Sequence, residues 1–306
     1  FAWFFLAFGL LSEIISYIRE KGKRIQLSEC KDRIERYMEH YVLVRLPAAF
    51  AIFIASFGIV FFYIGKSFVS YFGGFYMEET LLNIERTLHF GFYPVELLPE
   101  HITSLSSIKF LDFIYAKWFT VIFFFFFYTL FIEKDLFLQK RVVWCYLLGW
   151  LFLGIPFATL LSSAGPIFLD TLYNNKIGAY QNLLTKYQEM NALPNVDLGF
   201  LRGKDKLFSG YNRGDMFTLY AISAMPSLHV GFAWLNFLQA IKMNRWFGGA
   251  MFLYFICIFA GSVVLMWHYA IDGYVSIILM SLIRYFSGCF LKHKSCYRTN
   301  EHYLQT

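Results

Sequence analysis

Long, unbroken apolar stretches recur along this sequence, and each is close to the roughly 20 residues that an α-helix needs to cross a bilayer core. The stretches do not alternate between apolar and polar residues, which favours membrane-spanning helices over the strands of an outer-membrane barrel. Hydrophobic residues make up 58% of the chain and charged residues only 16%, too little polar surface for a soluble globule of 306 residues. We therefore predict an all-α, polytopic membrane protein folded as one helical bundle.

About seven transmembrane helices are predicted. They cover residues 1–18, 46–65, 111–132, 142–162, 218–241, 246–267 and 271–291. The first stretch lacks the basic leading region and the cleavage pattern of a signal peptide, so we treat it as a span. Between the second and third spans, residues 78–90 place Leu81, Ile84 and Leu88 on one helical face, which favours a helix lying in the membrane interface.

Lysine and arginine are concentrated in alternate connections between these spans. They crowd residues 19–45 and recur in residues 134–141, 242–245 and 292–298. By the positive-inside rule these segments are cytoplasmic, so the long connections 66–110 and 163–217 face outward. We expect a multi-pass protein of the plasma (inner) membrane with a cytoplasmic C-terminus. The net charge of +6 fits contact with anionic lipid head groups and predicts no nucleic-acid partner.

These boundaries divide the chain into three regions. Residues 1–110 hold the N-terminal helices, the basic connection and the outer interfacial helix. Residues 111–291 hold the core region with its outer loop 163–217, and residues 292–306 form a cytoplasmic tail. Neither outer loop contains a cysteine, so we expect no disulfide framework, and no paired Cys/His spacing suggests zinc.

The first of two informative segments runs Ser223-Ala224-Met225-Pro226-Ser227-Leu228-His229, where an apolar helix meets the outer water. Pro226 suits an early helical position because it lacks an N–H group. The next N–H groups, the Ser227 hydroxyl and the positive end of the helix dipole would then face a phosphate. His229 would lie within reach of the leaving oxygen of a phosphate ester. The segment fits a plain helix cap beside an interfacial histidine equally well.

The second segment is His268-Tyr269-Ala270-Ile271-Asp272. Residues four apart on a helix share a face, with β-carbons about 5–6 Å apart. Asp272 can hold one nitrogen of the His268 imidazole in its protonated form, which leaves the other nitrogen as a nucleophile. A structural His/Asp pair would explain this segment alone, but not a second histidine at the same membrane depth. An aspartate at that depth is costly unless it has a partner.

The two segments resemble the second and third signatures of the type 2 phosphatidic acid phosphatase superfamily, PSGH and SRxxxxxHxxxD. The form AMPSLHV followed by HYAID is similar to the branch that contains inositol phosphorylceramide synthases and related bacterial membrane proteins. The likeness covers residues 111–291 and implies a six-helix, phosphatase-type catalytic core that works without metal or cofactor. It also implies that His268 becomes phosphorylated, Asp272 orients it, His229 protonates the leaving group, and Ser227 and Ser262 contribute to substrate binding.

The chain departs from the family pattern where phosphate is bound. Val263 stands at the usual arginine of the third signature, Leu228 replaces the glycine of PSGH, and the first signature, KxxxxxxRP, is absent. Gly165 and Pro166 belong to an AGP segment similar to that of the same branch, so we expect them to line the pocket, although they bring no charge. At least one base from the outer loop should therefore fold over the site. The candidates are Arg202, Lys204, Lys206 and Arg213.

Together these features predict an enzyme, a histidine-dependent lipid phosphatase or phosphotransferase. Its partner is a membrane lipid substrate: a phospholipid, a lipid phosphate or a polyprenyl (pyro)phosphate. The acceptor is water or a small alcohol such as inositol, and the sequence leaves this choice, the lipid and the oligomeric state open. Two other interpretations remain. His229, His268 and Asp272 could bind a metal in a metal-dependent hydrolase, or the polar groups could serve a non-catalytic lipid-binding or transport protein.

Overall fold

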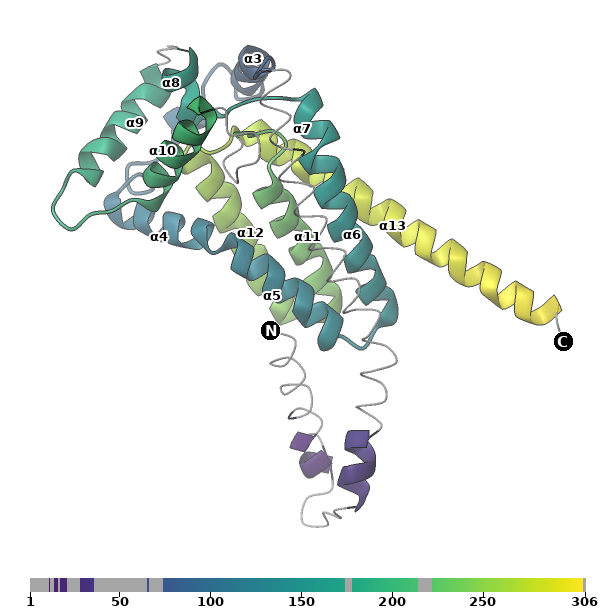
Figure 1. Ribbon diagram of the computed structural model, residues 1–306. Helices are drawn as coiled ribbons and strands as arrows, with labels where there is room; N and C mark the ends of the chain where they lie inside the picture. Colours follow the sequence, from purple (N-terminus) through teal and green to yellow (C-terminus); the bar gives the residue numbers. More distant parts are fainter. Residues whose placement is uncertain are drawn as a thin grey trace.

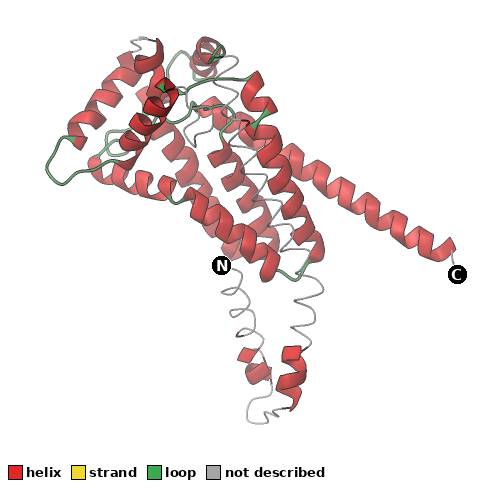
Figure 2. Ribbon diagram, viewed as in Figure 1, coloured by secondary structure: helices red, strands yellow, loops and turns green. Residues whose placement is uncertain are grey.

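The computed structural model describes residues 74–173, 178–213 and 222–304, together with a few residues nearer the N-terminus (11, 14–15, 17–20, 28–35 and 65). The predicted spans 1–18 and 46–65 therefore lie largely outside the described residues. Every regular element in the three long described ranges is a helix, which confirms the predicted all-α fold (Figures 1 and 2).

The elements follow one another from the outer region into the bundle. They are α3 (Glu78–Leu88), η1 (Pro94–Leu97), α4 (Leu105–Ala116), α5 (Trp118–Phe131), α6 (Leu136–Gly154), α7 (Pro156–Leu160), η2 (Pro166–Phe168), α8 (Leu169–Tyr173), α9 (Gly178–Asn191), α10 (Gly199–Asn212), α11 (Leu228–Met243), α12 (Arg245–Val264) and α13 (Ala270–Leu304). The described residues of the predicted outer loop 163–217 thus include three α-helices, because apolar residues of this segment pack onto the end of the bundle.

Three helical stretches among the described residues are long and apolar enough to cross a membrane, which confirms a membrane protein. They are Leu136–Leu160 (α6 with α7), Arg245–Val264 (α12) and Ala270–Lys292 (the first part of α13). The pair α4 and α5 passes the same test as one span broken by a bend of 44°. The predicted span 111–132 is therefore not one straight helix, since it bends at Lys117.

The predicted span 218–241 begins too early. Helix α11 starts only at Leu228, and residues 222–227 are irregular. Ser227 is the N-cap residue, and its hydroxyl accepts the N–H of Val230 at 3.4 Å. Pro226, expected inside the first turn, precedes this cap. Serine is a favoured N-cap residue because its oxygen satisfies one of the unpaired N–H groups of the first turn, and this local bond fixes the start of α11.

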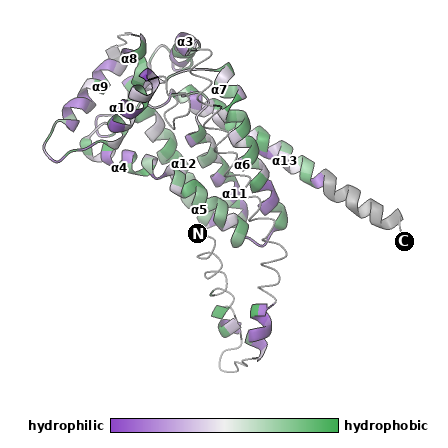
Figure 3. Ribbon diagram, in the orientation of Figure 1, coloured by the Kyte–Doolittle hydropathy of each residue, from purple (hydrophilic) through white to green (hydrophobic). Residues whose placement is uncertain are grey.

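Helix α11 lies in the middle of the bundle and packs against α6, α12 and α13. Aromatic rings fill the space between α5, α6 and α11, where Trp118, Trp150 and Phe232 stack edge to face or tilted. Apolar residues run along the bundle helices, whereas more polar residues cover α9 and α10 (Figure 3). Helices α3, α8, α9 and α10 gather at one end of the bundle (Figure 1). That end also carries the first turns of α11 and α13.

Helix α3 packs onto the protein through a stripe that shares only Leu81 with the apolar face predicted for the membrane interface. Of the three residues on that predicted face, Leu81 is buried, whereas Ile84 is 38% and Leu88 51% exposed. The buried residues are Glu78, Leu81, Leu82 and Glu85. Positions spaced three, four and seven apart form one helical stripe. The buried stripe of α3 therefore contains two carboxylates, and both have hydrogen-bond partners in the site.

Candidate active site

His268 and Asp272 form a hydrogen-bonded pair, although only Asp272 lies in α13; His268 lies in a bend before the helix and not on the shared helical face that the spacing predicted. The distance from His268 Nδ1 to Asp272 Oδ2 is 3.3 Å, and the same carboxylate oxygen accepts the Tyr269 N–H at 3.1 Å. The His268 N–H donates to the Ser262 carbonyl at 3.0 Å. Asp272 is fully buried and His268 is 6% exposed. The imidazole is thus fixed both through its ring and through its backbone.

His229 lies in the first turn of α11 and is held by two aromatic residues of the α4–α5 bend. Its ring stacks on Tyr115 with centroids 4.4 Å apart and contacts Trp118 at 4.2 Å. Trp118 Nε1–H also donates to the His229 carbonyl at 3.1 Å. The His229 and His268 ring centroids are 5.9 Å apart. The two imidazoles are therefore close enough for one phosphoryl group to contact both.

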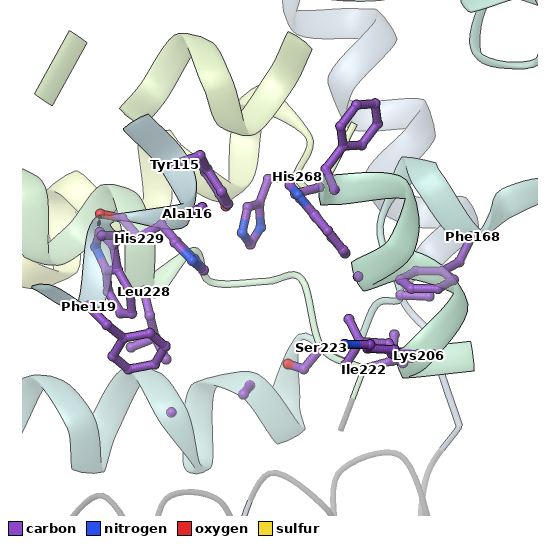
Figure 4. Close-up of a pocket in the computed structure, with 18 of the residues that line it drawn as sticks. Tyr115, Ala116, Phe119, Phe168, Lys206, Ile222, Ser223, Leu228, His229 and His268 are labelled. Atoms are coloured by element: carbon purple, nitrogen blue, oxygen red, sulfur yellow. Dashed lines mark hydrogen bonds between the residues drawn. The ribbon is translucent and has the colours of Figure 1, made fainter. Parts of the chain in front are cut away.

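Both histidines line a cavity of about 590 Å³. His229 and Tyr115 lie on one side and Phe168 and Lys206 on the other, with His268 between them (Figure 4). Trp118, Trp150 and Trp267 are also part of the lining, which is mainly apolar. A few polar groups in a mostly apolar cavity are typical of a small-molecule site, and this lining suits a ligand with a hydrocarbon part.

Two of the four candidate bases reach this cavity. Arg202 and Lys206 are four residues apart on α10 and line it, whereas Lys204 and Arg213 do not. Arg202 also forms an exposed ion pair with Asp197, with Nη1 and Oδ2 2.7 Å apart. The start of α10 is held by Asp112 of α4, whose carboxylate accepts the Gly199 N–H at 2.6 Å. Helix α10 is therefore fixed where it presents its two cations.

Neither serine proposed for substrate binding places its hydroxyl in the cavity. Ser227 is fully buried, its hydroxyl caps α11, and its N–H donates to the Asp272 carbonyl at 3.4 Å. The Ser262 hydroxyl donates to the Phe259 carbonyl at 2.7 Å. These residues instead connect the two histidine segments, Ser227 by joining α11 to α13 and Ser262 by holding the His268 backbone.

The segment Ser163–Ile167 also joins the two histidine segments. The Ser163 carbonyl accepts the Ala224 N–H, and the Ile167 N–H donates to the Met266 carbonyl, both at 2.9 Å. Gly165 has a φ of +92°, and a Cβ there would lie 2.6 Å from the Trp267 carbonyl oxygen, so only glycine fits. Gly165 and Pro166 were expected to line the cavity but are not among its lining residues, whereas their neighbour Ala164 is.

Glu78 of α3 connects the segment 163–167 to Tyr269, the residue after His268. One carboxylate oxygen accepts the Ala164 N–H at 2.6 Å, and the other accepts the Tyr269 hydroxyl at 2.5 Å. Glu78 is only 3% exposed, and burial raises the pKa of this carboxyl. The carboxyl group therefore joins the backbone of Ala164 to the side chain of Tyr269.

Glu85, two helical turns further along α3, holds the start of α13. Its two oxygens accept the N–H groups of Ala270 and Ile271, at 2.8 and 3.0 Å. Its side chain is fully buried, and burial raises its pKa as well. The interpretation of the sequence missed both glutamates. The available signal was their spacing of seven residues, with Leu81 and Leu82 between them on the same face.

The sequence left open a metal site made of His229, His268 and Asp272. Within residues 74–173, 178–213 and 222–304 no three His, Cys, Asp or Glu side chains come together as metal ligands. His229 and His268 approach each other, but Asp272 lies on the Nδ1 side of His268 and is buried behind it. The geometry is that of an oriented imidazole facing a second imidazole.

A comparison with protein families identifies the chain. The family model described as the PAP2 superfamily matches residues 79–286, more than half of the sequence. No curated protein and no solved structure matches the chain. The matched range contains Glu85, the two α10 cations that line the cavity (Arg202 and Lys206) and both histidine segments. The chain therefore belongs to the PAP2 superfamily, and this membership supports a phosphatase-type activity in general terms.

Proposed function

We propose that this protein is a lipid phosphatase or phosphotransferase that transfers a phosphoryl group through a phosphohistidine at His268. The observation that carries the proposal is the position of the two imidazoles, which line one cavity 5.9 Å apart while Asp272 orients one of them. Membership of the PAP2 superfamily supports a lipid phosphate substrate in general terms.

In the first step His268 attacks the phosphorus of the lipid. With its proton on Nδ1 and donated to Asp272, the imidazole has its lone pair on Nε2. As the Nε2–P bond forms, the P–O bond to the lipid breaks and its electron pair stays on the leaving oxygen. That oxygen takes a proton from the imidazolium of His229. Such proton transfer by a positioned histidine contributes about 10²- to 10⁴-fold to a rate.

In the second step His229, now neutral, removes a proton from the acceptor. The acceptor oxygen attacks phosphorus, the P–N bond breaks, and the electron pair returns to Nε2 of His268. Water as acceptor makes the protein a phosphatase, and a small alcohol such as inositol makes it a phosphotransferase. The AMPSLHV form of the first segment, which resembles that of inositol phosphorylceramide synthases, favours the alcohol.

Arg202 and Lys206 serve as the cations that the missing first signature would supply. Much of the catalysis of phosphoryl transfer is positioning and charge stabilisation, so a site without cations would be a poor one. Both side chains line the cavity, and Lys206 lies on the side away from His229 (Figure 4). The ion pair between Arg202 and Asp197 is exposed, so exchanging Asp197 for a phosphate costs little.

The aromatic part of the lining suits the lipid part of the substrate, with the hydrocarbon tails in the bilayer and the phosphate beside the histidines. The bias of lysine and arginine residues favours the extracytoplasmic side of the plasma (inner) membrane for this end of the bundle. Both the substrate class and this orientation belong to the proposal.

Incubation of the purified protein with a panel of labelled lipid phosphates, with and without inositol or other alcohols, tests this function. We expect at least one substrate to release phosphate or to transfer it to the alcohol, and His268→Ala to abolish either product. The identity of the product separates phosphatase from phosphotransferase. If no phospholipid, lipid phosphate or polyprenyl phosphate turns over, the non-catalytic interpretation replaces this one.

A further inference from the structure

Two arginines lie inside the bundle at the end away from the histidines. Arg141 is in the second turn of α6, and Arg284 lies in the second half of the membrane-spanning part of α13. Both side chains are about half-buried and reach adjacent residues near the C-terminal end of α11. Arg141 Nη2–H donates to Gln239 Oε1 at 3.1 Å, and Arg284 Nη2–H donates to the Leu238 carbonyl at 3.2 Å.

These contacts leave the two positive charges without an ion pair in the described part of the chain. Both acceptors are neutral, and Nε of each arginine is buried without a hydrogen-bond partner. The charge of Arg284 acts on Arg141, so the guanidinium groups repel each other. Asp135 attracts Arg141, but its carboxylate caps α6 by accepting the N–H groups of Phe137 and Leu138. Two neighbouring charges inside a membrane bundle are costly unless an anion joins them.

The surface beside the arginines is apolar and exposed. On α13, Tyr285 and Phe286 are 65% and 63% exposed, and Phe290 is 50% exposed. Phe290 also contacts Trp144 of α6, with ring centroids 5.7 Å apart. An anion that satisfies the guanidinium groups from this side therefore has hydrocarbon contacts available next to it, which a free phosphate ion cannot use.

We propose that Arg141 and Arg284 bind the phosphate of an anionic phospholipid in the leaflet opposite the catalytic histidines. Guanidinium groups match phosphate oxygens in geometry and bind them through paired, charge-assisted hydrogen bonds. Basic pockets between transmembrane helices are known to take lipid head groups. The lipid phosphate pairs with both arginines, and its acyl chains cover the aromatic residues of α13 and α6. This site is independent of the reaction proposed for the other end.

The test uses the full-length protein purified in detergent, with binding of dioctanoyl phosphatidylglycerol followed by native mass spectrometry and by the shift of the thermal midpoint. Dioctanoyl phosphatidylcholine and inorganic phosphate are the comparison ligands. The variant is Arg141→Gln with Arg284→Gln. The control is Lys242→Gln with Arg245→Gln, which removes the same charge from exposed residues near the same end of the bundle.

We expect the arginine variant to bind phosphatidylglycerol at least about tenfold more weakly, the size of effect expected from losing one charge-assisted hydrogen bond. The control should bind within about twofold of wild type, since exposed charges contribute little. Equal losses in both variants, or unchanged binding in the arginine variant, overturn the site. Equal binding of inorganic phosphate or phosphatidylcholine overturns its specificity for an anionic lipid.

Stability without lipid gives a second measurement that does not depend on finding the right lipid. Because the arginines repel each other, their replacement should leave the thermal midpoint in lipid-free detergent unchanged or higher. Added phosphatidylglycerol should raise the midpoint of wild type but not of the variant. If the variant is much less stable without lipid, the arginines are structural and the proposal fails. Arg284→Lys, which keeps the charge but loses the planar donor group, should bind with intermediate affinity.

Discussion

Glu85 of α3 accepts the backbone N–H of Ala270 at 2.8 Å, so a carboxyl group 185 residues away in sequence caps the helix that carries Asp272. The same side chain accepts the N–H of Ile271. A helix start has unpaired N–H groups and a positive dipole end, both of which a carboxylate satisfies. The position of Asp272 relative to His268 therefore depends on a residue outside both histidine segments.

Replacement of this carboxyl group should damage both stability and catalysis. In Glu85→Gln the side-chain amide can accept only one of the two N–H groups and places its own donors against the other. We expect a loss of about 1–3 kcal/mol in the free energy of unfolding, the cost of an unpaired buried polar group. We also expect kcat to fall while KM changes little, because the Asp272 geometry is disturbed and the cavity is not. Thermal melts and steady-state kinetics measure these effects.

The matched control is Glu79→Gln on the same helix, where the side chain is exposed. This variant should melt and turn over like wild type. A Glu85→Gln variant with a lower thermal midpoint but an unchanged kcat would show that Glu85 supports the fold and does not position the site.

The buried glutamates should also make stability depend on pH. Burial raises the pKa of Glu78 and Glu85 above the ordinary 4.5. When folding raises the pKa of a carboxyl group, the folded state binds its proton more tightly than the unfolded state does. The contribution of this group to the free energy of unfolding is therefore at its full size at pH values below the pKa of the unfolded state. This stability is lost as pH rises through the folded pKa, by about 1.4 kcal/mol for each pH unit that separates the unfolded pKa from the folded one.

We therefore expect the thermal midpoint of wild type to fall as pH rises from about 4.5 through the raised pKa values. The double variant Glu78→Gln/Glu85→Gln should show a flatter dependence in the same detergent, since all other titrating groups are shared. Parallel curves for the two proteins would mean that the glutamates do not titrate in this range.

The two cations that line the cavity, Arg202 and Lys206, should contribute to catalysis, whereas the nearby cations outside its lining should not. Arg202→Gln with Lys206→Gln should lower kcat/KM by about 10²-fold or more, the effect of removing a group that stabilises charge in the transition state. Lys204→Gln with Arg213→Gln removes the same charge from residues outside the cavity lining and should have little effect. Steady-state kinetics with a lipid phosphate substrate measure both. Similar losses in the two variants would point to general attraction of the anionic substrate instead of a specific phosphate contact.

The acid role of His229 predicts a dependence on the leaving group. In His229→Gln, the rate of phosphorylating the protein should fall by about 10²- to 10⁴-fold with an alkyl phosphate, whose leaving oxygen needs a proton. With p-nitrophenyl phosphate the loss should be much smaller, because that leaving group is stable without a proton. Single-turnover measurements isolate this step from the second one. The same loss with both substrates would assign His229 to binding.

Much of the architecture could be predicted from local sequence patterns. The apolar stretches predict spanning helices because hydrophobic burial in a bilayer depends on a run of neighbouring residues. The spacing of His268 and Asp272 predicted their contact, but the helical reason was wrong, because His268 lies in a bend before α13 and Asp272 reaches back to it from the first turn. Contacts across long sequence distances could not be predicted in this way, and the bonds from Glu78 and Glu85 are of that kind.

The phosphate-binding residues show the same limit. The sequence offered four equivalent bases in a region expected to be a loop, so nothing distinguished Arg202 and Lys206 from Lys204 and Arg213. Their difference arises from the helical phase of α10 and from Asp112, which holds its start. Ser227 and Ser262 were assigned by the resemblance to substrate binding, but their hydroxyls form local bonds that only the backbone geometry reveals.

The proposed phosphohistidine at His268 is tested most directly by trapping labelled phosphate on the protein. The purified protein is mixed with a labelled lipid phosphate under single-turnover conditions and quenched in alkali. We predict label that is stable in alkali and lost in acid, maps to the peptide containing His268 and is absent in His268→Ala. Turnover without any labelled protein, or label that persists in His268→Ala, would contradict the account.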